Sequence, residues 1–164
     1  MARVLIVGCG CRGRSLAGEL IAAGHAVRGT TRDPARAAEI EAIGAEAVVG
    51  DPDVIATLAR SLDHVSVACV LLGSAGGSAE GLAALHGTRL EMLLTRMLDT
   101  TVRGIVYEAT GSVDRALLDA GVELVRERCE DSRIPFALLD ADPGDWSGWT
   151  SAAVRGVESV LVRR

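Results

Sequence analysis

The chain has 164 residues, a length that suits one domain with a substantial core. It is 49% hydrophobic but only 2% aromatic, so the core must consist of Ala, Val, Leu and Ile, as in a parallel sheet buried on both faces. The net charge of −5 argues against nucleic acid as a partner. The longest apolar run, 65–72, is too short to cross a bilayer, and the N-terminus begins a strand without a signal-peptide pattern. We therefore expect a cytoplasmic protein with no membrane partner.

Two features of the composition limit the chemistry. The four cysteines form no C-x-x-C pair and no metal-ligand spacing, so we expect free thiols and no bound metal. The chain contains no lysine, and all 17 of its basic residues are arginines. No reaction step can therefore use a lysine as a proton donor or as a Schiff base.

Residues 4–13 combine an apolar run with a glycine motif. The run 4–7 is typical of a buried strand, and it ends in Gly-x-Gly-x-x-Gly, after which a helical pattern begins. In this strand–turn–helix order the motif indicates dinucleotide binding. The first glycine permits a tight turn, the second lets the backbone approach a pyrophosphate, and the third lets the helix pack close to the strand, while free N–H groups hold the phosphates. The motif places cofactor contacts at Gly8, Cys9, Gly10, Cys11, Arg12 and Gly13.

Strand and helix patterns alternate along the whole chain, which predicts a parallel sheet built from β-α-β units. Strands are expected near 3–8, 26–31, 46–49, 64–71, 104–109 and 135–140. Helices are expected near 12–23, 34–43, 53–61, 79–99, 112–130 and 151–162, the third of them capped by Asp51 or Asp53. No linker interrupts the pattern. Residues 1–164 are therefore predicted to form a single α/β domain, a doubly wound Rossmann fold whose six-stranded parallel sheet has the order 3-2-1-4-5-6 and helices on both faces.

The end of the second strand indicates which dinucleotide binds. An NAD site usually has an acidic residue there, whereas an NADP site has a small residue followed by an arginine for the 2′-phosphate. Thr31 ends this strand, Arg32 follows it, and Arg36 lies one helical turn further on. Asp33 stands where an NAD-type acid is expected, but Pro34 follows it, so its carboxylate is expected to cap a helix. The pattern favours NADP over NAD, the alternative being that Arg32 is a solvated surface residue.

Several segments together resemble a known family. The segments are 24–36, 44–51, 86–94, 102–111 and 134–140. They resemble the atypical and extended short-chain dehydrogenase/reductases, the NAD(P)-binding, sugar-epimerase-like proteins. The resemblance implies that Asp51 meets the adenine and that Leu72 and Gly73 pass beside the adenine-side ribose and the pyrophosphate. The alternative for Asp51 is a helix cap.

The chain departs from that family at its catalytic residues. Active members use a Ser or Thr after the fifth strand together with a Tyr-x-x-x-Lys pair. Thr110 holds the Ser/Thr position and is the candidate catalytic residue, although Thr110 and Ser112 are alternatively helix caps. The single tyrosine, Tyr107, lies within the strand and is expected to be packed there. The chain also stops soon after the sixth strand, so the resemblance implies a version without the C-terminal substrate domain.

Further residues are candidates for the same sheet edge, where open α/β sheets bind ligands. The other candidate proton donors are Ser74, Glu108, Ser112 and Asp142. Trp146 and Trp149 follow the sixth strand and are expected to roof a pocket, to fill an interface or to pack in the core. The three histidines show no ligand spacing. His25 begins a strand, and His64 and His86 are expected to be ordinary polar residues.

Three functions fit these observations. The first is an NADP(H)-binding protein with weak or no catalysis, acting as a cofactor sensor or as a partner subunit. The alternative is an NADP-dependent oxidoreductase or epimerase-like enzyme on a small carbonyl substrate. A weaker alternative is the nucleotide-binding regulatory domain of potassium transport systems, which carries an acid at the second strand end where this chain has Thr31. The apolar residues of the expected helix 79–99 further predict a homodimer.

Overall fold

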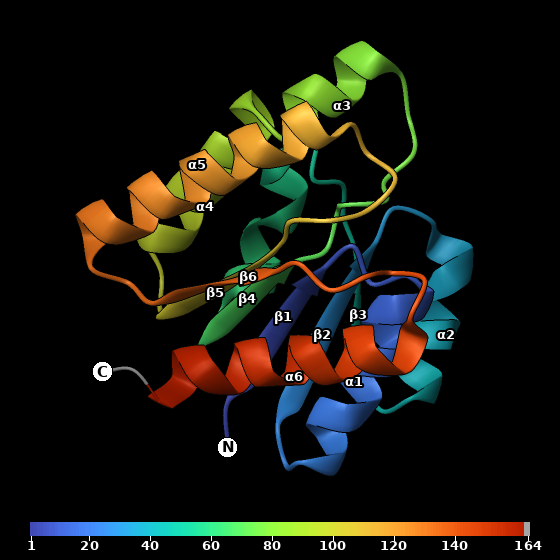
Figure 1. The fold of residues 1–164 in the computed structure, drawn as a ribbon. Coiled ribbons are helices and arrows are strands. Elements are labelled where there is room, and N and C mark those ends of the chain that lie inside the picture. The colour runs from blue at the N-terminus through green and yellow to red at the C-terminus, as the bar shows by residue number, and fades with distance from the viewer. Residues whose placement is uncertain (163–164) are drawn as a thin grey trace.

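The computed structural model describes residues 1–162, and its centre is a six-stranded sheet. The strands are β1 (Arg3–Val7), β2 (Ala26–Thr31), β3 (Glu46–Val49), β4 (Val67–Val70), β5 (Gly104–Glu108) and β6 (Phe136–Leu139). Their order is β3-β2-β1-β4-β5-β6, and every neighbouring pair is parallel. The predicted doubly wound fold is confirmed, and the carboxyl ends of all strands meet at one edge of the sheet (Figure 1).

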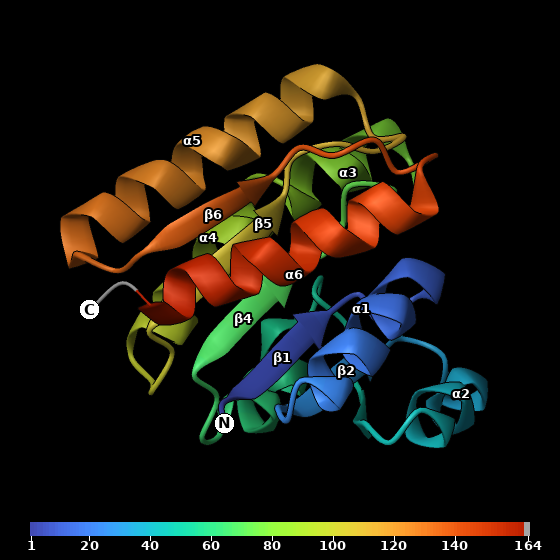
Figure 2. The same cartoon turned by 60° about the horizontal axis from the view of Figure 1, so that its bottom comes forward.

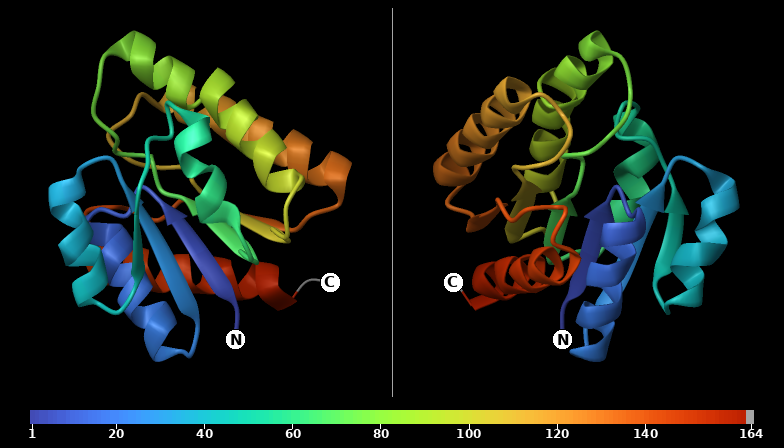
Figure 3. Two further views of the ribbon diagram at one scale, coloured as in Figure 1. Left: turned by 180° about the vertical axis from the view of Figure 1, so that it is seen from behind. Right: turned by 45° about the vertical axis from the view of Figure 1, so that its right-hand side comes forward.

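Helices cover both faces of the sheet (Figures 2 and 3). One face carries α1 (Cys11–Ala22), α2 (Ala37–Ala42) and α6 (Trp146–Val162), with the 3-10 helix η1 (Pro34–Arg36) leading into α2. The other face carries the 3-10 helix η2 (Ile55–Leu62), α3 (Ala79–Leu85), α4 (Thr88–Leu98) and α5 (Arg115–Ser132). No helix within residues 1–162 is long and apolar enough to cross a membrane.

The central strand β1 shows why its sequence is apolar throughout. Val4 and Ile6 pack in the core beneath α1 and α6, whereas Leu5 and Val7 pack in the core beneath η2, α3 and α4. All four side chains are fully buried. A strand covered on both faces cannot alternate with polar residues, so the unbroken apolar run follows from its central position.

The last helix, α6, begins at Trp146 rather than near 151, so Trp146 and Trp149 belong to the helix. Two other predicted helices also differ in the structure. The helix expected over 79–99 ends at Leu85, and α4 begins after Gly87, whose φ of −120° and ψ of −105° are not helical. A Cβ on Gly87 would lie 2.6 Å from the carbonyl oxygen of Ala83, so this turn between the two helices requires glycine. The segment expected as the helix 53–61 is the 3-10 helix η2, and Val54 precedes it. The prediction that Asp51 or Asp53 caps it is therefore wrong. Asp51 instead accepts the N–H of Asp53 through Oδ1, at 2.9 Å.

The apolar residues that predicted a homodimer are used within the chain. Leu90, Leu93, Leu94 and Met97 of α4 are buried in the core formed with η2, α5 and the sheet. Met92 is the exception, because 49% of it is exposed. The apolar content of α4 is thus explained without a second copy, and the homodimer stays a prediction.

The contact between α5 and β5 gives a test of the packing. A Cβ on Gly121 would lie 2.0 Å from Oη of Tyr107, so Gly121→Ala should destabilise the fold by about 1–3 kcal/mol through overpacking. Gly18 is the matched control, because it is also helical and a Cβ there meets nothing within 4 Å. Gly18→Ala should leave stability unchanged or raise it by about 0.5–1 kcal/mol. Urea unfolding of both variants measures this, and equal effects would contradict the tight contact.

Candidate functional site

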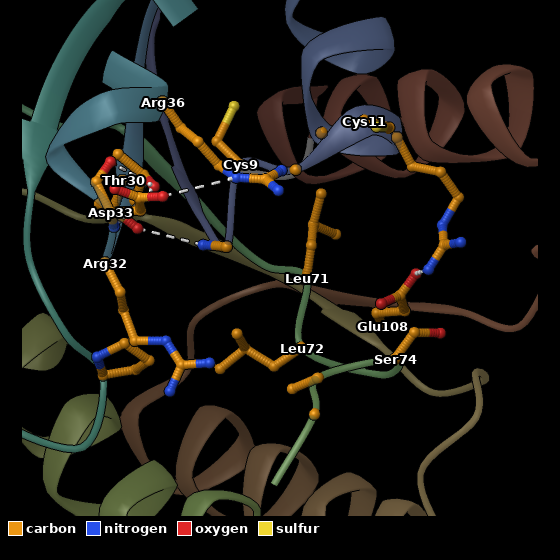
Figure 4. Close-up of a pocket in the computed structure, with 18 of the residues that line it drawn as sticks. Cys9, Cys11, Thr30, Arg32, Asp33, Arg36, Leu71, Leu72, Ser74 and Glu108 are labelled. Atoms are coloured by element: carbon orange, nitrogen blue, oxygen red, sulfur yellow. Dashed lines mark hydrogen bonds and ion pairs between the residues drawn. The ribbon is translucent and has the colours of Figure 1, made fainter. Parts of the chain in front are cut away.

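A pocket of about 660 Å³ opens at the edge where the strands end (Figure 4). It lies between the loops that follow β1, β2 and β4, with Glu108 and the start of α6 at one end. Most of the predicted cofactor-binding residues line it: Gly8, Cys9, Gly10, Cys11, Arg12, Gly13, Thr31, Arg32, Arg36 and Leu72. The remaining predicted residues lie at its border or outside it. Asp51 stands between the lining residues Gly50 and Pro52, Gly73 follows Leu72, and Thr110 is not among the lining residues.

The three glycines of the loop have separate physical roles. Gly8 has a φ of +85°, and a Cβ there would lie 2.6 Å from the carbonyl oxygen of Leu71. A Cβ on Gly13 would lie 3.3 Å from the carbonyl oxygen of Gly8, so this glycine sets how closely α1 packs on the loop. A Cβ on Gly10 would meet nothing within 4 Å. Gly10 is therefore not required by the protein's own packing, and the open space beside it belongs to the pocket.

The start of α1 faces this open space with unused donors. Gly10 precedes the helix, and within residues 1–162 no side chain caps it. The first N–H groups of a helix have no intrahelical acceptor, and the positive end of the helix dipole adds to their attraction for anions. The loop itself is anchored to β2, since Thr30 accepts N–H groups from both Gly8 (3.1 Å) and Cys9 (2.9 Å). A rigid loop with free donors and an open approach is suited to a phosphate.

Two arginines lie beyond the end of β2, and the acid nearest to Thr31 in the sequence, Asp33, has one of its carboxylate oxygens engaged within the chain. Asp33 accepts the N–H of Ala35 through Oδ1 at 2.9 Å and so caps η1, as the sequence predicted. Arg32 is about half exposed and lies 3.9 Å from Asp53, and Arg36 lies 3.9 Å from Asp33. Both pairs are longer than a hydrogen bond, so both guanidinium groups are available to a ligand.

Glu108 ends β5 at the other side of the pocket and is only 1% exposed. Its Oε1 accepts the N–H of Gly73 at 2.8 Å, and its Oε2 accepts the indole N–H of Trp149 at 3.0 Å. The guanidinium of Arg12 lies 3.9 Å from Oε2 and 5.6 Å from the centre of the Trp149 ring. Burial raises the pKa of Glu108, and the N–H of Gly73, Arg12 and Trp149 oppose that rise. The sequence named Glu108 as one candidate among several but did not predict this cluster.

The candidate catalytic hydroxyl is engaged elsewhere. Thr110 donates through Oγ1 to the carbonyl oxygen of Ala141 at 2.8 Å, which ties the loop after β5 to the loop after β6. The alternative that Thr110 and Ser112 cap the next helix is wrong, because Asp114 caps α5 by accepting the N–H of Ala116. Trp149 is buried and Trp146 half exposed, and both line the pocket.

A buried histidine supports the pocket wall from behind. The Nε2 of His86 lies 2.9 Å from the carbonyl oxygen of Leu72, and its Nδ1 lies 2.6 Å from Oη of Tyr107. Because a carbonyl oxygen only accepts, Nε2 carries the proton, and in neutral His86 the Nδ1 accepts from the tyrosine hydroxyl. Tyr107 is packed within β5 as predicted, whereas the expectation that His86 is an ordinary polar residue is wrong. Burial lowers the pKa of His86.

Comparison with known proteins assigns the family. Residues 4–110 match the TrkA-N domain. The chain belongs to the TrkA-N domain family. A comparison with curated protein sequences found no match. The family match covers the glycine loop, both arginines at the end of β2 and all strands from β1 to β5, so the whole pocket except the start of α6 belongs to the TrkA-N domain.

Solved structures with the same fold include oxidoreductases and epimerases. A short-chain dehydrogenase/reductase superfamily protein from Agrobacterium tumefaciens with bound NAD has a TM-score of 0.69 at 20% identity, over 83% of this chain and 48% of that one. UDP-glucose 4-epimerase from Thermotoga maritima has a TM-score of 0.69 at 12% identity, over 83% of this chain and 54% of that one. An NADPH-dependent quinone oxidoreductase from Escherichia coli has a TM-score of 0.60 at 20% identity, over 84% of this chain and 46% of that one. The TrkA-N chain spans about half the length of each. These structures confirm the doubly wound Rossmann fold.

The buried histidine predicts a pH-dependent stability. The pKa of His86 is lower in the folded protein than its value of 6.5 in an unfolded chain, so the unfolded state binds the proton more readily. Stability should therefore fall as the pH drops below about 6.5. Urea unfolding at about pH 7.5 and about pH 5.5 measures this loss, which should be smaller in His86→Gln. Glu108, whose raised pKa acts in the opposite direction, is present in both proteins, so the comparison isolates His86. An equal loss in both would contradict the assignment.

Proposed function

We propose that this TrkA-N chain is an NADP(H)-binding domain that senses the cofactor and has little or no catalytic activity of its own. The observation that carries the proposal is the pair of loosely held guanidinium groups of Arg32 and Arg36, beside a β2 end whose nearby acid, Asp33, caps a helix. A 2′-phosphate would find charge-assisted, bidentate donors there.

The rest of the pocket fits the same cofactor. The free N–H groups at the start of α1 and the open space beside Gly10 are suited to a pyrophosphate. Arg12 adds a further free donor at the loop, because its Nε is buried without a hydrogen-bond partner within residues 1–162. The similar structures include one with bound NAD and one described as NADPH-dependent. When bound, the cofactor would supply the hydride, and the chain would have to supply a proton.

The described residues do not form the tyrosine–lysine proton relay of the short-chain dehydrogenase/reductases. The single tyrosine is buried and hydrogen-bonded to His86, the hydroxyl of Thr110 is bonded to Ala141, and the chain has no lysine. Activity as an NADP-dependent oxidoreductase or epimerase on a small carbonyl substrate is therefore the alternative proposal. The cytoplasmic location and the homodimer belong to the sensor proposal as expectations.

The TrkA-N family match favours a second candidate function, the nucleotide-binding regulatory domain of a potassium transport system. Thr31 at the end of β2 distinguishes this chain from the acidic residue expected for that type. Potassium uptake by cells that lack the chain tests this candidate. Uptake restored by the wild-type chain but not by Gly10→Val would support it, and uptake unaffected by the chain would exclude it.

Arg32→Ala should weaken the binding of NADP(H) without weakening that of NAD(H). Loss of a hydrogen bond to a charged group costs about 1.5–3 kcal/mol, so the variant should bind NADP(H) more weakly by that amount and NAD(H) almost unchanged. Calorimetry measures both affinities. Arg103→Ala is the control, because Arg103 is exposed and precedes β5, at the opposite edge of the sheet. Equal losses for both cofactors would contradict the 2′-phosphate contact.

Gly10→Val should abolish binding of both NADP(H) and NAD(H) while preserving the fold, because a Cβ there meets no protein atom within 4 Å.

Purified protein should bind NADPH and oxidise it slowly or not at all across a panel of carbonyl substrates. The missing proton donor is worth about 10²–10⁴-fold in rate. Thr110→Ala should change little, because the hydroxyl of Thr110 is bonded to a backbone carbonyl. NADPH absorbance follows the reaction. Fast turnover that disappears in Thr110→Ala would favour the enzyme over the sensor.

A further inference from the structure

Arg12 lies between the carboxylate of Glu108 and the phosphate loop, where a bound phosphate would compete with Glu108 for its guanidinium. It is the second residue of α1, beside the free N–H groups of the phosphate loop, and it lines the pocket. Its guanidinium is 3.9 Å from Glu108, which is beyond hydrogen-bond distance. Its Nε is buried and has no hydrogen-bond partner among residues 1–162. The present contacts of Arg12 therefore leave much of its donor capacity unused.

Glu108 keeps its own hydrogen bonds whether or not Arg12 is near. The N–H of Gly73 satisfies one carboxylate oxygen and the indole N–H of Trp149 satisfies the other. Departure of Arg12 removes only a long electrostatic contact from Glu108. A phosphate at the start of α1 would offer Arg12 short, charge-assisted hydrogen bonds in its place. In this exchange Arg12 gains hydrogen bonds, whereas the buried carboxylate of Glu108 loses its nearby cation, which is unfavourable.

Trp149 connects this exchange to α6. Its ring lies under the guanidinium of Arg12, and its indole N–H holds the first turns of α6 to the end of β5. The next residue, Thr150, lies 3.1 Å from Ser15 of α1 through the two hydroxyl oxygens. Helix α6 then runs across the sheet next to α1 (Figures 1 and 2). Any movement of Arg12 therefore changes the surroundings of a residue that anchors α6.

We propose that Arg12 is a switch residue that links occupancy of the phosphate loop to α6. With the loop filled, the guanidinium turns from Glu108 and Trp149 toward the phosphates, and the start of α6 loses one of its contacts. This inference rests on the proposed function, since it takes a dinucleotide phosphate as the anion that draws Arg12 away. In this view α6 is the part of the sensor that responds to the cofactor, because its contacts at Trp149 change when the loop is filled.

The fluorescence of Trp149 tests the switch. In a Trp146→Phe background Trp149 is the single tryptophan, and calorimetry on that background checks its affinities directly. Three probes are used: NADP⁺, inorganic pyrophosphate, and adenosine 2′-monophosphate. NADP⁺ and pyrophosphate should shift the emission of Trp149, because both fill the phosphate loop. The monophosphate should bind at Arg32 without a shift, because it carries no 5′-phosphate for the loop.

Two variants separate the switch from a direct effect of the ligand. Arg12→Gln should weaken NADP⁺ on the order of 10-fold and remove the emission shift at saturation. Arg14→Gln is the matched control, because Arg14 lies in the same turn but its guanidinium contacts Glu39 and Sγ of Cys11, and it does not line the pocket. It should keep the shift.

The outcomes distinguish the switch from the cofactor assignment. NADP⁺ that binds without a shift, or a shift that persists in Arg12→Gln, would overturn the switch and leave the cofactor assignment intact. A shift with pyrophosphate but no binding of NADP⁺ or of adenosine 2′-monophosphate would support the switch and overturn NADP as the ligand. Absence of binding by all three probes would overturn both.

Discussion

The buried carboxylate of Glu108 is the interaction on which the pocket depends. It joins the end of β5 to the loop after β4 through Gly73 and to α6 through Trp149. The two loops meet so closely that a Cβ on Gly73 would lie 2.0 Å from the carbonyl oxygen of Thr110. A carboxylate in this position satisfies two buried N–H groups at once, which would otherwise each cost free energy. The floor of the pocket is therefore fixed before any ligand arrives.

The distribution of charge around the pocket follows from this arrangement. The protein has a net charge of −5, yet arginines stand at both ends of the pocket and the positive end of α1 lies between them. Of the acids at the pocket, Asp33 caps a helix and Glu108 is buried and hydrogen-bonded. The pocket therefore presents guanidinium donors, the groups that suit carboxylates and phosphates, at two separated points.

Local patterns in the sequence were sufficient for most of the fold and for one end of the site. The apolar run before Gly8, the glycine spacing and the Asp-Pro pair at 33–34 each depend on neighbours within a few residues, and the structure confirms them. The break at Gly87 was missed because it depends on how closely two turns approach, which apolar periodicity does not report.

The partners of Glu108 and His86 were missed for a related reason. Trp149 is 41 residues from Glu108, and Tyr107 is 21 residues from His86, so only the folded topology brings these side chains together. A buried acid or histidine leaves one weak signal in sequence, a titratable residue at the end of an apolar strand or between apolar turns. That signal singles out Glu108 but not its partners.

Thr110, at the Ser/Thr position of the short-chain dehydrogenase/reductases, and Tyr107, the single tyrosine, both make contacts within this TrkA-N domain. Tyr107 orients His86, which in turn holds the carbonyl oxygen of Leu72 at the pocket wall. Thr110 joins two loops at the sheet edge. The hydroxyls of Tyr107 and Thr110 are thus engaged by partners within the chain. The contacts of Arg12 with Glu108 and Trp149 are long and its Nε is unpaired within the described chain, so Arg12 can take a ligand at the pocket as a new partner.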